Sequence, residues 1–597
     1  MHPLAPLAMA GALWTGGLAP PAPTDSLPVT RALPDTAARV ATAPRWMVAS
    51  AHPLASLAGA RILAAGGSAA DAGVAVQAAL SVVEPESSGP GGGCFILYHD
   101  APRDTLWAID GREELPAWNR ADMFMEAGRI VPEPYTGGAA VGVPGTVDAM
   151  SRLHALAGRL PLREVLAPAV AIADTGFAVG PDLARASRDN AFRLRRYPAS
   201  RALYLRDDGS PLAEGDRLRN CDLADFFRHW ADEPTGRFFY QGDLAWAITA
   251  AVGGDKFRKG RMMQADLGNY HAPLREPVVG SYRGRRIVAF PPPTSGGITL
   301  LEILGILETR PAPPDPRGGD AALLAFLDGL ARASRVAYAD RDRYLGDPDW
   351  SPDVPMRGLL DPAFVAQQAR AAFDPAAPLD SLAAAGDPPA HTTHFCVVDA
   401  EGSVLSCTST IETVFGSAMV LPGWGFVLNN ELTDFNLVPA AGEDYPRPND
   451  IQGGRRIRAT ALDGRVPPGG KRPRSSMCPV IVYGDDGRPE LALGSPGGAR
   501  IIGTVAGTLL LLLDHDFTLA EALAFPRLHC RNRPLEIETW GWNRGVLADS
   551  LGARGWPVAP LTSWPLLQGD VQALRILPDG RRRGASDPRH DGAPRGG

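Results

Sequence analysis

The sequence contains very little lysine. Lysine occurs only at Lys256, Lys259 and Lys471, and arginine supplies almost all of the positive charge. The net charge is −7 at pH 7 and the sequence pI is about 5.9, so the chain lacks the basic character of a nucleic-acid-binding protein. With 45% hydrophobic and 21% charged residues, the composition is that of an ordinary globular protein. We therefore expect no nucleic-acid partner.

Cysteine is also scarce, and none of the six cysteines forms a CxxC pair. The sequence thus indicates neither a zinc ribbon nor a redox motif, and six cysteines are too few for a disulfide framework in so long a chain. We expect small buried side chains at Cys94, Cys221, Cys396, Cys407, Cys478 and Cys530. The glycine-rich SSGPGGG is not followed by GK[ST], which excludes a P-loop. The sequence contains no G-x-S-x-G motif, so it does not indicate a serine hydrolase of the α/β-hydrolase type.

No apolar run is long enough to cross a membrane. The longest run, from Ile501 to Leu513, is stopped by Asp514 and His515. It falls short of the roughly 20 residues that a span requires, so we expect a buried helix there and no transmembrane span.

The N-terminus, MHPLAPLAMAGALWTGGLAPPAP, is apolar and rich in small residues and then in proline. It predicts a signal peptide and Pro-rich leader over residues 1–30, with cleavage near Ala19 or Ala22 and a periplasmic or extracellular location. No lysine or arginine precedes Arg31, so the usual basic segment is missing. A cytoplasmic location is therefore the alternative.

Patterning along the chain predicts a mixture of helices and strands. SLAGARILAAGGSAADAGVAVQAALSVV reads as two alanine-rich helices broken at Gly66-Gly67, and residues 375–389 have the composition of a linker. A β-hairpin is predicted from the strand-like runs THFCVVD and SVLSCTST and from the turn between them at residues 399–402. Further strand-like runs are REPVVGSYRGRRIVAF, MVLPGWGFVLNN, MCPVIVYGDDG and PELALGS. The tail GRRRGASDPRHDGAPRGG is polar, and we expect its end to be unstructured.

A doubled threonine stands where the linker meets the hairpin, in HTTHFCVVD from His391 to Asp399. Two β-branched residues at the start of a strand are ordinary, but threonine becomes a nucleophile when a base lies beside it. A free α-amine on the same residue provides that base, and it exists only after cleavage of the preceding bond. The hypothesis is that Thr392 attacks the His391 carbonyl, so that the intact chain is a precursor of a large subunit, 31–391, and a small catalytic subunit, 392–597. His391 and His394 would point to opposite faces of the strand, and we expect no metal and no cofactor.

Several blocks in order along the chain resemble one family. In the C-terminal third they are HTTHFCVVDAEG, TSTIE, FGSAM, NNELTDF, KRPRSSMCP and GSPGGAR; earlier ones are SAHPLAS, GGSAADA, VVEPESSGPGGG, DGREELPA, AVGVPGTV and PPPTSGG. They resemble the gamma-glutamyltransferases (gamma-glutamyltranspeptidases) of the N-terminal nucleophile hydrolase superfamily, from about Met47 to Asp587. The resemblance implies an α/β fold, a four-layer αββα sandwich. It also implies a heterodimer formed from one self-cleaved precursor.

The resemblance also implies the catalytic residues. Thr392 would be the nucleophile and Thr410 the second threonine that supports it. On the predicted hairpin the two would lie opposite each other, within about 5 Å. Gly497 and Gly498 match the pair whose backbone N–H groups stabilise the oxyanion.

A substrate pocket follows in the same way, because a γ-glutamyl group carries an α-carboxylate and an α-ammonium. Arg112 matches the arginine that binds the carboxylate through its planar fork. The other matching residues are Ser475 and Ser476, for the carboxylate, and Glu412, Glu431 and Asp434, for the ammonium. The sequence departs from the family pattern in three places. Glu412 stands where many family members have asparagine, and Pro90 and Cys94 interrupt a block that is usually glycine and aliphatic. The segment before Ser475 is long, and Tyr445 in it could serve as the aromatic residue of a lid.

The implied activity is hydrolysis and transfer of γ-glutamyl groups through a threonine acyl-enzyme. Glutathione would be the donor, and water, an amino acid or a peptide the acceptor. One alternative on the same scaffold is a glutaryl-type β-lactam acylase or a poly-γ-glutamate-cleaving relative; another is an uncleaved binding protein without activity. A glutaryl group has no α-ammonium, so the acids Glu431 and Asp434 favour the γ-glutamyl hypothesis.

Overall fold

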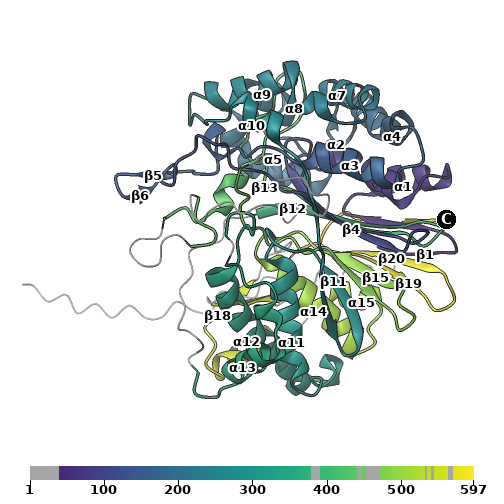
Figure 1. The fold of residues 1–597 in the computed structure, drawn as a ribbon, viewed down its shortest axis with the longest axis vertical. Helices are drawn as coiled ribbons and strands as arrows, with labels where there is room; N and C mark the ends of the chain where they lie inside the picture. The colour runs from purple at the N-terminus through teal and green to yellow at the C-terminus, as the bar shows by residue number, and fades with distance from the viewer. Residues whose placement is uncertain are drawn as a thin grey trace, which may run out of the picture. The chain divides into compact units, whose positions relative to one another are not determined.

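Two seven-stranded antiparallel β-sheets lie face to face in the computed structural model (Figure 1). The structure describes residues 39–351, 353–377, 379, 390–439, 447–451, 470–531, 534–538, 544–561 and 569–597. The first sheet has the spatial order β21 (Arg595–Gly596), β2 (Met47–Ser50), β12 (Ala390–Val398), β13 (Val404–Thr413), β3 (Gly93–Asp100), β4 (Thr105–Gly111) and β9 (Leu274–Arg275). The second has the order β1 (Val40–Ala43), β20 (Arg582–Ser586), β19 (Gln572–Ile576), β15 (Pro489–Gly494), β14 (Val480–Tyr483), β11 (Arg285–Ala289) and β10 (Val278–Tyr282).

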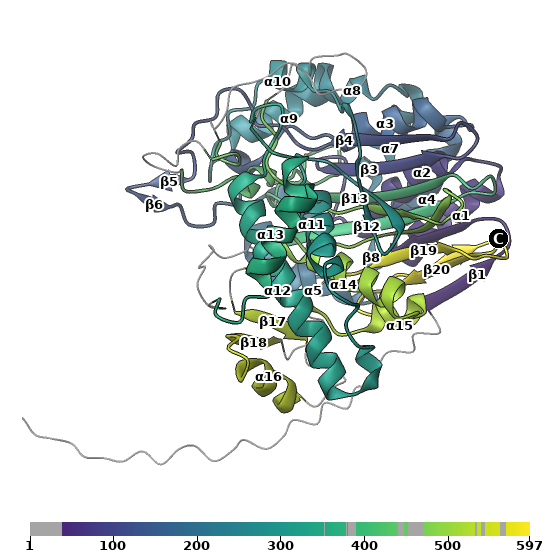
Figure 2. The ribbon, with the colours of Figure 1, turned by 60° about the horizontal axis from the view of Figure 1, so that its bottom comes forward.

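The first sheet is buried on both faces, and strand β12 shows how. Phe395 and Val397 belong to the core on the helical side of this sheet, whereas Cys396 and Val398 belong to the core that includes the second sheet. Side chains alternate along a strand, so Thr392 and His394 share the inter-sheet face with Cys396. Figure 2 shows β4, β3, β13 and β12 as successive strands, with β19, β20 and β1 beyond them.

Helices cover the outer faces of both sheets, which confirms the predicted four-layer αββα architecture (Figure 1). Next to the first sheet lie α1 (Pro53–Ala64), α2 (Ala69–Val83), α3 (Thr146–Ala157), α4 (Leu162–Thr175) and α7 (Cys221–Asp232), with α5 (Pro181–Leu194), α6 (Pro198–Tyr204), α8 (Arg237–Tyr240), α9 (Gly242–Gly254) and α10 (Gln264–Asn269) around them. On the other side lie α11 (Gly296–Glu308), α12 (Asp320–Tyr344), α13 (Pro362–Ala372), α14 (Arg500–Asp514), α15 (Leu519–Ala524) and α16 (Arg544–Gly552). Smaller sheets are formed by β16 (Leu528–His529), β17 (Leu535–Glu538) and β18 (Val558–Leu561), by β5 (Met125–Glu126) with β6 (Arg129–Ile130), and by β7 (Phe177–Ala178) with β8 (Arg217–Leu218).

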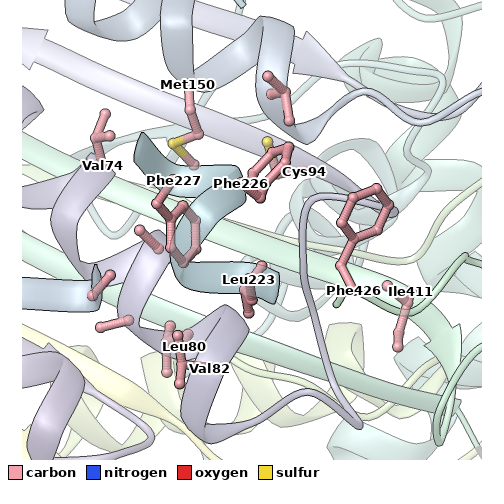
Figure 3. Close-up of a cluster of buried hydrophobic side chains, with 14 of the residues drawn as sticks. Val74, Leu80, Val82, Cys94, Met150, Leu223, Phe226, Phe227, Ile411 and Phe426 are labelled. Atoms are coloured by element: carbon pink, nitrogen blue, oxygen red, sulfur yellow. The ribbon is translucent and has the colours of Figure 1, made fainter. Parts of the chain in front are cut away.

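Helix α2 is the apolar centre of the first helical layer, and all of its residues are buried. It begins at a capping box in which the Ser68 side chain accepts from the Asp71 N–H and the Asp71 carboxylate accepts from the Ser68 N–H. Its side chains pack with residues of β3, α3, α7 and the loop after β13, as Figure 3 shows for Val74, Leu80 and Val82. This packing fixes the C-terminal end of α2, which leads directly to Glu84 and the site described below.

Most of the predicted elements are present. The helix break falls at Gly66, whose φ is +92°, the apolar run from Ile501 lies inside buried helix α14, and no helix in the described ranges is long and apolar enough to span a membrane. Residues 419–430 were predicted as a strand and have only a single bridge, between Val420 and Val427. Pro422, which has no N–H to donate, interrupts that pairing.

Two other expectations were wrong. The C-terminal tail is ordered: β20 pairs with β1 and β19, and β21 pairs with β2. Cys221 is exposed, whereas the other five cysteines are buried. The leader, most of the linker at residues 375–389 and Tyr445 lie outside the described residues.

Candidate active site

The two threonines face each other across the hairpin. Thr392 on β12 is paired with Thr410 on β13, and their hydroxyl oxygens are 3.1 Å apart. The Thr410 hydroxyl donates to the carbonyl oxygen of His391 at 3.0 Å and accepts from the backbone N–H of Glu412 at 2.8 Å. Because Thr410 has one proton and a carbonyl can only accept, that proton is used on His391, and Thr392 must donate to Thr410. Thr410 therefore polarises the carbonyl of His391 and accepts a hydrogen bond from the hydroxyl of Thr392.

The residues next to Thr392 are held by the segment that follows α2. Thr393 donates its hydroxyl proton to Glu84 at 2.9 Å, and Ser87 lies 2.7 Å from Nδ1 of His391. Burial, and then the charge of Glu86, raise the pKa of Glu84 well above its ordinary value. Burial lowers the pKa of His391 to about 4, so this imidazole is neutral at pH 7. Sequence reasoning did not find these partners, because they lie about 300 residues earlier in the chain.

Gly497 and Gly498 lie between the end of β15 and the start of α14. Their φ angles are +129° and +56°, a region that residues with a Cβ rarely adopt. Gly497 lines a cavity together with Thr392. Backbone N–H groups next to a helix N-terminus are suited to stabilising negative charge.

Arg112 lies just after β4 and is completely buried. It forms ion pairs with Glu431 and Asp434 and donates from Nε to the Pro473 carbonyl at 3.0 Å. Burial alone would lower the pKa of this guanidinium, but the charges of Glu431 and Asp434 raise it above its ordinary value. These bonds use three of its five N–H groups. Two remain that could bind a carboxylate.

Glu412 links the arginine cluster to the threonines. Its backbone N–H bonds Thr410, its φ is +80°, and its side chain is 3% exposed. Among the described residues, neither carboxylate oxygen of Glu412 has a hydrogen-bond partner, and neither does Oε2 of Glu431. Burial and the charges of Asp434 and Glu431 raise the pKa of Glu412. A strained residue with unpaired buried oxygens is typical of a binding site, and a cation with several N–H donors would satisfy these oxygens.

Ser475 and Ser476 are held from α12 by an arginine that sequence reasoning missed. Arg341 donates from Nη2 to the Ser476 hydroxyl at 2.6 Å and from Nε to the Ser295 hydroxyl at 2.8 Å. Ser295 in turn donates to the Ser475 carbonyl at 2.6 Å. A hydroxyl that accepts from a guanidinium has its own proton available for another acceptor, so Arg341 orients Ser476 as a donor.

The structure therefore connects some of the predicted site residues directly. Thr392, Thr410 and Glu412 form one hydrogen-bonded chain, and charge interactions join Glu412 to the cluster around Arg112. The cavity beside Thr392 is instead lined by His391, Gly497 and residues on the other side of the nucleophile. Among the described residues, no group of three or more His, Cys, Asp or Glu side chains is arranged to hold a metal.

Comparison with known proteins shows the family of the chain. The family model for gamma-glutamyltranspeptidase matches residues 55–597. The chain belongs to the gamma-glutamyltranspeptidase family. Members of this family are enzymes, and the proenzyme names of the relatives below are consistent with a heterodimer formed from one precursor.

Relatives with two different activities are similar to the chain. It is 35% identical to a glutathione hydrolase proenzyme of Bacillus subtilis, covering 92% of this chain and 90% of the relative. It is 36% identical to the acylase ACY 1 proenzyme of a Pseudomonas species, covering 92% and 93%. Overall identity therefore does not distinguish a glutathione hydrolase from an acylase.

The solved structures similar to the chain also include both an acylase and a gamma-glutamyltranspeptidase. The fold matches cephalosporin acylase from Bacillus halodurans with a TM-score of 0.79 at 25% identity, covering 98% of this chain and 99% of that one. It matches gamma-glutamyltranspeptidase from Helicobacter pylori with a TM-score of 0.50 at 34% identity, covering 54% and 89%. These matches confirm the predicted N-terminal nucleophile hydrolase fold, and substrate preference must be argued from the site.

Proposed function

We propose that the chain is the precursor of a γ-glutamyl hydrolase and transferase that cleaves itself before Thr392. In the precursor, Thr392 Oγ1 attacks the His391 carbonyl carbon, and the C–N bond breaks to leave an ester. The proton of the hydroxyl passes to the departing nitrogen, which becomes the free α-amine of Thr392. Water then hydrolyses the ester to the carboxylate of His391 and the hydroxyl of Thr392. The observation that carries this step is the Thr410 hydroxyl, which donates to the carbonyl under attack and accepts from the attacking hydroxyl.

The mature enzyme would use the new amine as its base. Thr392 attacks the γ-carbonyl of the donor, the α-amine takes the hydroxyl proton and passes it to the leaving amine, and the N–H groups of Gly497 and Gly498 stabilise the oxyanion. The acyl-enzyme is then released to water or to an acceptor amine. Glutathione is the proposed donor, in line with the glutathione hydrolases among the relatives.

The cluster of residues around Arg112 supports a γ-glutamyl group over a glutaryl group. Arg112, with Ser475 and Ser476, would bind the α-carboxylate, and the unpaired oxygens of Glu412 and Glu431, with Asp434, would bind the α-ammonium. A glutaryl group would bring no N–H donor to the two oxygens of Glu412 and Oε2 of Glu431, which have no hydrogen-bond partner among the described residues. Leaving buried charged acceptors unpaired costs several kcal/mol.

Anilide substrates test this proposal. We expect the processed protein to hydrolyse γ-glutamyl anilide at least about 100-fold more efficiently than glutaryl anilide, because loss of one or two charged hydrogen bonds costs about 3 kcal/mol. A preference for the glutaryl substrate would support the acylase alternative, which is motivated by the similarity of the chain to acylases. Release of oligomers from poly-γ-glutamate would support the polymer-cleaving alternative.

A denaturing gel separates both enzymes from a silent binding protein. Cleavage before Thr392 would give two bands of roughly 41 and 22 kDa, in proportion to residue number. A binding protein would give one band at the full mass.

A further inference from the structure

The backbone of residues 412–418, at the end of β13, has an unusual conformation. Its φ angles are +80° at Glu412, +58° at Phe415, +47° at Gly416 and +65° at Ala418. Three of these four residues carry a Cβ, and such residues keep a positive φ only where the surrounding structure holds them there. The conformation of Glu412, whose unpaired oxygens belong to the proposed ammonium site, therefore depends on the contacts of the whole segment.

Arg193 on α5 bonds two carbonyl groups of the 412–418 segment. Its Nη1 donates to the Val414 carbonyl at 2.9 Å, and its Nη2 donates to the Gly416 carbonyl. Arg193 is 2% exposed. Burial lowers the pKa of its guanidinium to about 10, although the charge of Glu412 opposes this shift. The group is therefore charged at pH 7, and both hydrogen bonds are of the stronger, charge-assisted kind.

The other N–H groups of Arg193 are bonded to α5 itself and to residues 135–136. Nε donates to the Thr136 hydroxyl at 2.9 Å, Nη1 also donates to the Asn190 side chain at 3.1 Å, and Nη2 also donates to the Tyr135 carbonyl at 3.2 Å. A guanidinium has five N–H groups, so all five are bonded to the protein. Arg193 has no donor left for a substrate, and its planar fork is fixed in one orientation.

Glu412 is thus held from two sides. Its N–H donates to the Thr410 hydroxyl at 2.8 Å, and Val414, two positions later, is held by Arg193. Without the guanidinium, the carbonyls of Val414 and Gly416 would lose a charged donor. Nothing would then keep the strained φ of Glu412, and its relaxation to a negative φ would turn the carboxylate in another direction.

The proposed self-cleavage makes this an intersubunit contact, because Arg193 would belong to the large subunit and the 412–418 segment to the small one. Ser200 on α6 makes a second contact of the same kind, and its hydroxyl donates to the Ala418 carbonyl at 2.7 Å. Ser200 therefore holds the end of the segment that is farther along the chain from Glu412, whereas Arg193 holds the part next to Glu412.

We propose that Arg193 is a positioning residue that sets the preference of the site for donors with an α-ammonium group, because it fixes the backbone that carries Glu412. This inference rests on the proposed function. Arg193 acts through Glu412 and does not contact the donor. A glutaryl donor has no ammonium for Glu412 to bind, so a displaced Glu412 would weaken the reaction of γ-glutamyl donors alone.

The test compares kcat/KM for γ-glutamyl anilide with kcat/KM for glutaryl anilide in the processed protein. Arg193→Met keeps the aliphatic part of the side chain and removes the guanidinium. We expect it to lower the ratio of the two values about tenfold, as for the loss of one charge-assisted contact. Ser200→Ala is the matched control, because it removes a buried hydrogen bond from the same segment, and its ratio should stay near that of the wild type. An unchanged ratio in Arg193→Met, or an equal fall in Ser200→Ala, would overturn the inference.

A double variant separates positioning from a general packing defect. In Glu412→Gln there is no carboxylate for Arg193 to position, so the addition of Arg193→Met should lower the ratio no further. A second fall of about tenfold would show that Arg193 acts independently of Glu412, which contradicts the proposed role.

Arg193→Lys decides the question if Arg193→Met fails to fold or to cleave itself. Lysine keeps the charge but lacks the planar fork that reaches both carbonyls, so we expect the ratio to fall at least about threefold. A wild-type ratio in this variant would refute the positioning role. If the wild-type protein does not prefer γ-glutamyl anilide, the proposed function itself fails; a wild-type preference that survives in the Arg193 variants refutes this inference alone.

Discussion

The hydroxyl of Thr410 should control the rate of self-cleavage. Thr410→Val keeps the shape of the side chain and removes its only donor, which is 3.0 Å from the His391 carbonyl oxygen. That oxygen becomes the oxyanion when Thr392 attacks, and removal of one such donor slows a reaction by about 10²- to 10³-fold. The substitution also leaves the Glu412 N–H without the acceptor at 2.8 Å, which costs about 1–3 kcal/mol of folding free energy.

Purified precursor, followed by gel densitometry over time, gives the half-time of cleavage. We expect Thr410→Val to lengthen it by about 10²- to 10³-fold and Thr410→Ser, which restores the hydroxyl, to stay near the wild type. Circular dichroism should show that both variants are folded. If folded Thr410→Val cleaves within a few-fold of the wild-type rate, the role derived from the hydrogen bonds of Thr410 is wrong.

Three further predictions follow from the site. Glu412→Gln should lower kcat/KM for γ-glutamyl anilide by about tenfold or more but not for glutaryl anilide; equal losses on the two would count against an ammonium contact. Arg341→Met should raise the KM for γ-glutamyl anilide about tenfold without raising it for 4-aminobutyryl anilide, which lacks the carboxylate that Ser476 would bind, whereas a general packing defect would affect both. Although burial lowers the pKa of His590, Asp182 raises it to about 10, above the unfolded value of about 6.5. The stabilisation is therefore complete below pH 6.5 and lost as pH rises through 10, so the Tm of the wild type should fall more between pH 6 and 10 than that of Asp182→Asn.

The nucleophile hairpin could be predicted from the sequence because its signals are local. Alternation along THFCVVD and SVLSCTST and the turn between them set the register, and this register places Thr392 opposite Thr410. The same holds for the break at Gly66 and for buried helix α14, where composition and structure agree within one short segment.

Contacts between distant segments could not be predicted in this way. Glu84 bonds Thr393, and Arg341 bonds Ser476, although the two residues of each pair lie more than 100 positions apart in the sequence. The tail was predicted to be unstructured at its end because its composition is polar and of low complexity. Its order comes from backbone pairing of β20 with β1 and β19 and of β21 with β2. The candidate substrate-binding residues were predicted from the resemblance to gamma-glutamyltransferases. The positive φ of Glu412 and its two oxygens without a hydrogen-bond partner among the described residues could be seen only in the structure.

Self-cleavage before Thr392 can be tested most directly by N-terminal sequencing of the smaller fragment of purified active protein, together with its intact mass. The first residues should read TTHFCVVD, and Thr392→Ala should remain a single chain without activity. A fragment that begins at another residue, or an unbroken chain that hydrolyses γ-glutamyl anilide, would contradict the assignment of Thr392 as an N-terminal nucleophile.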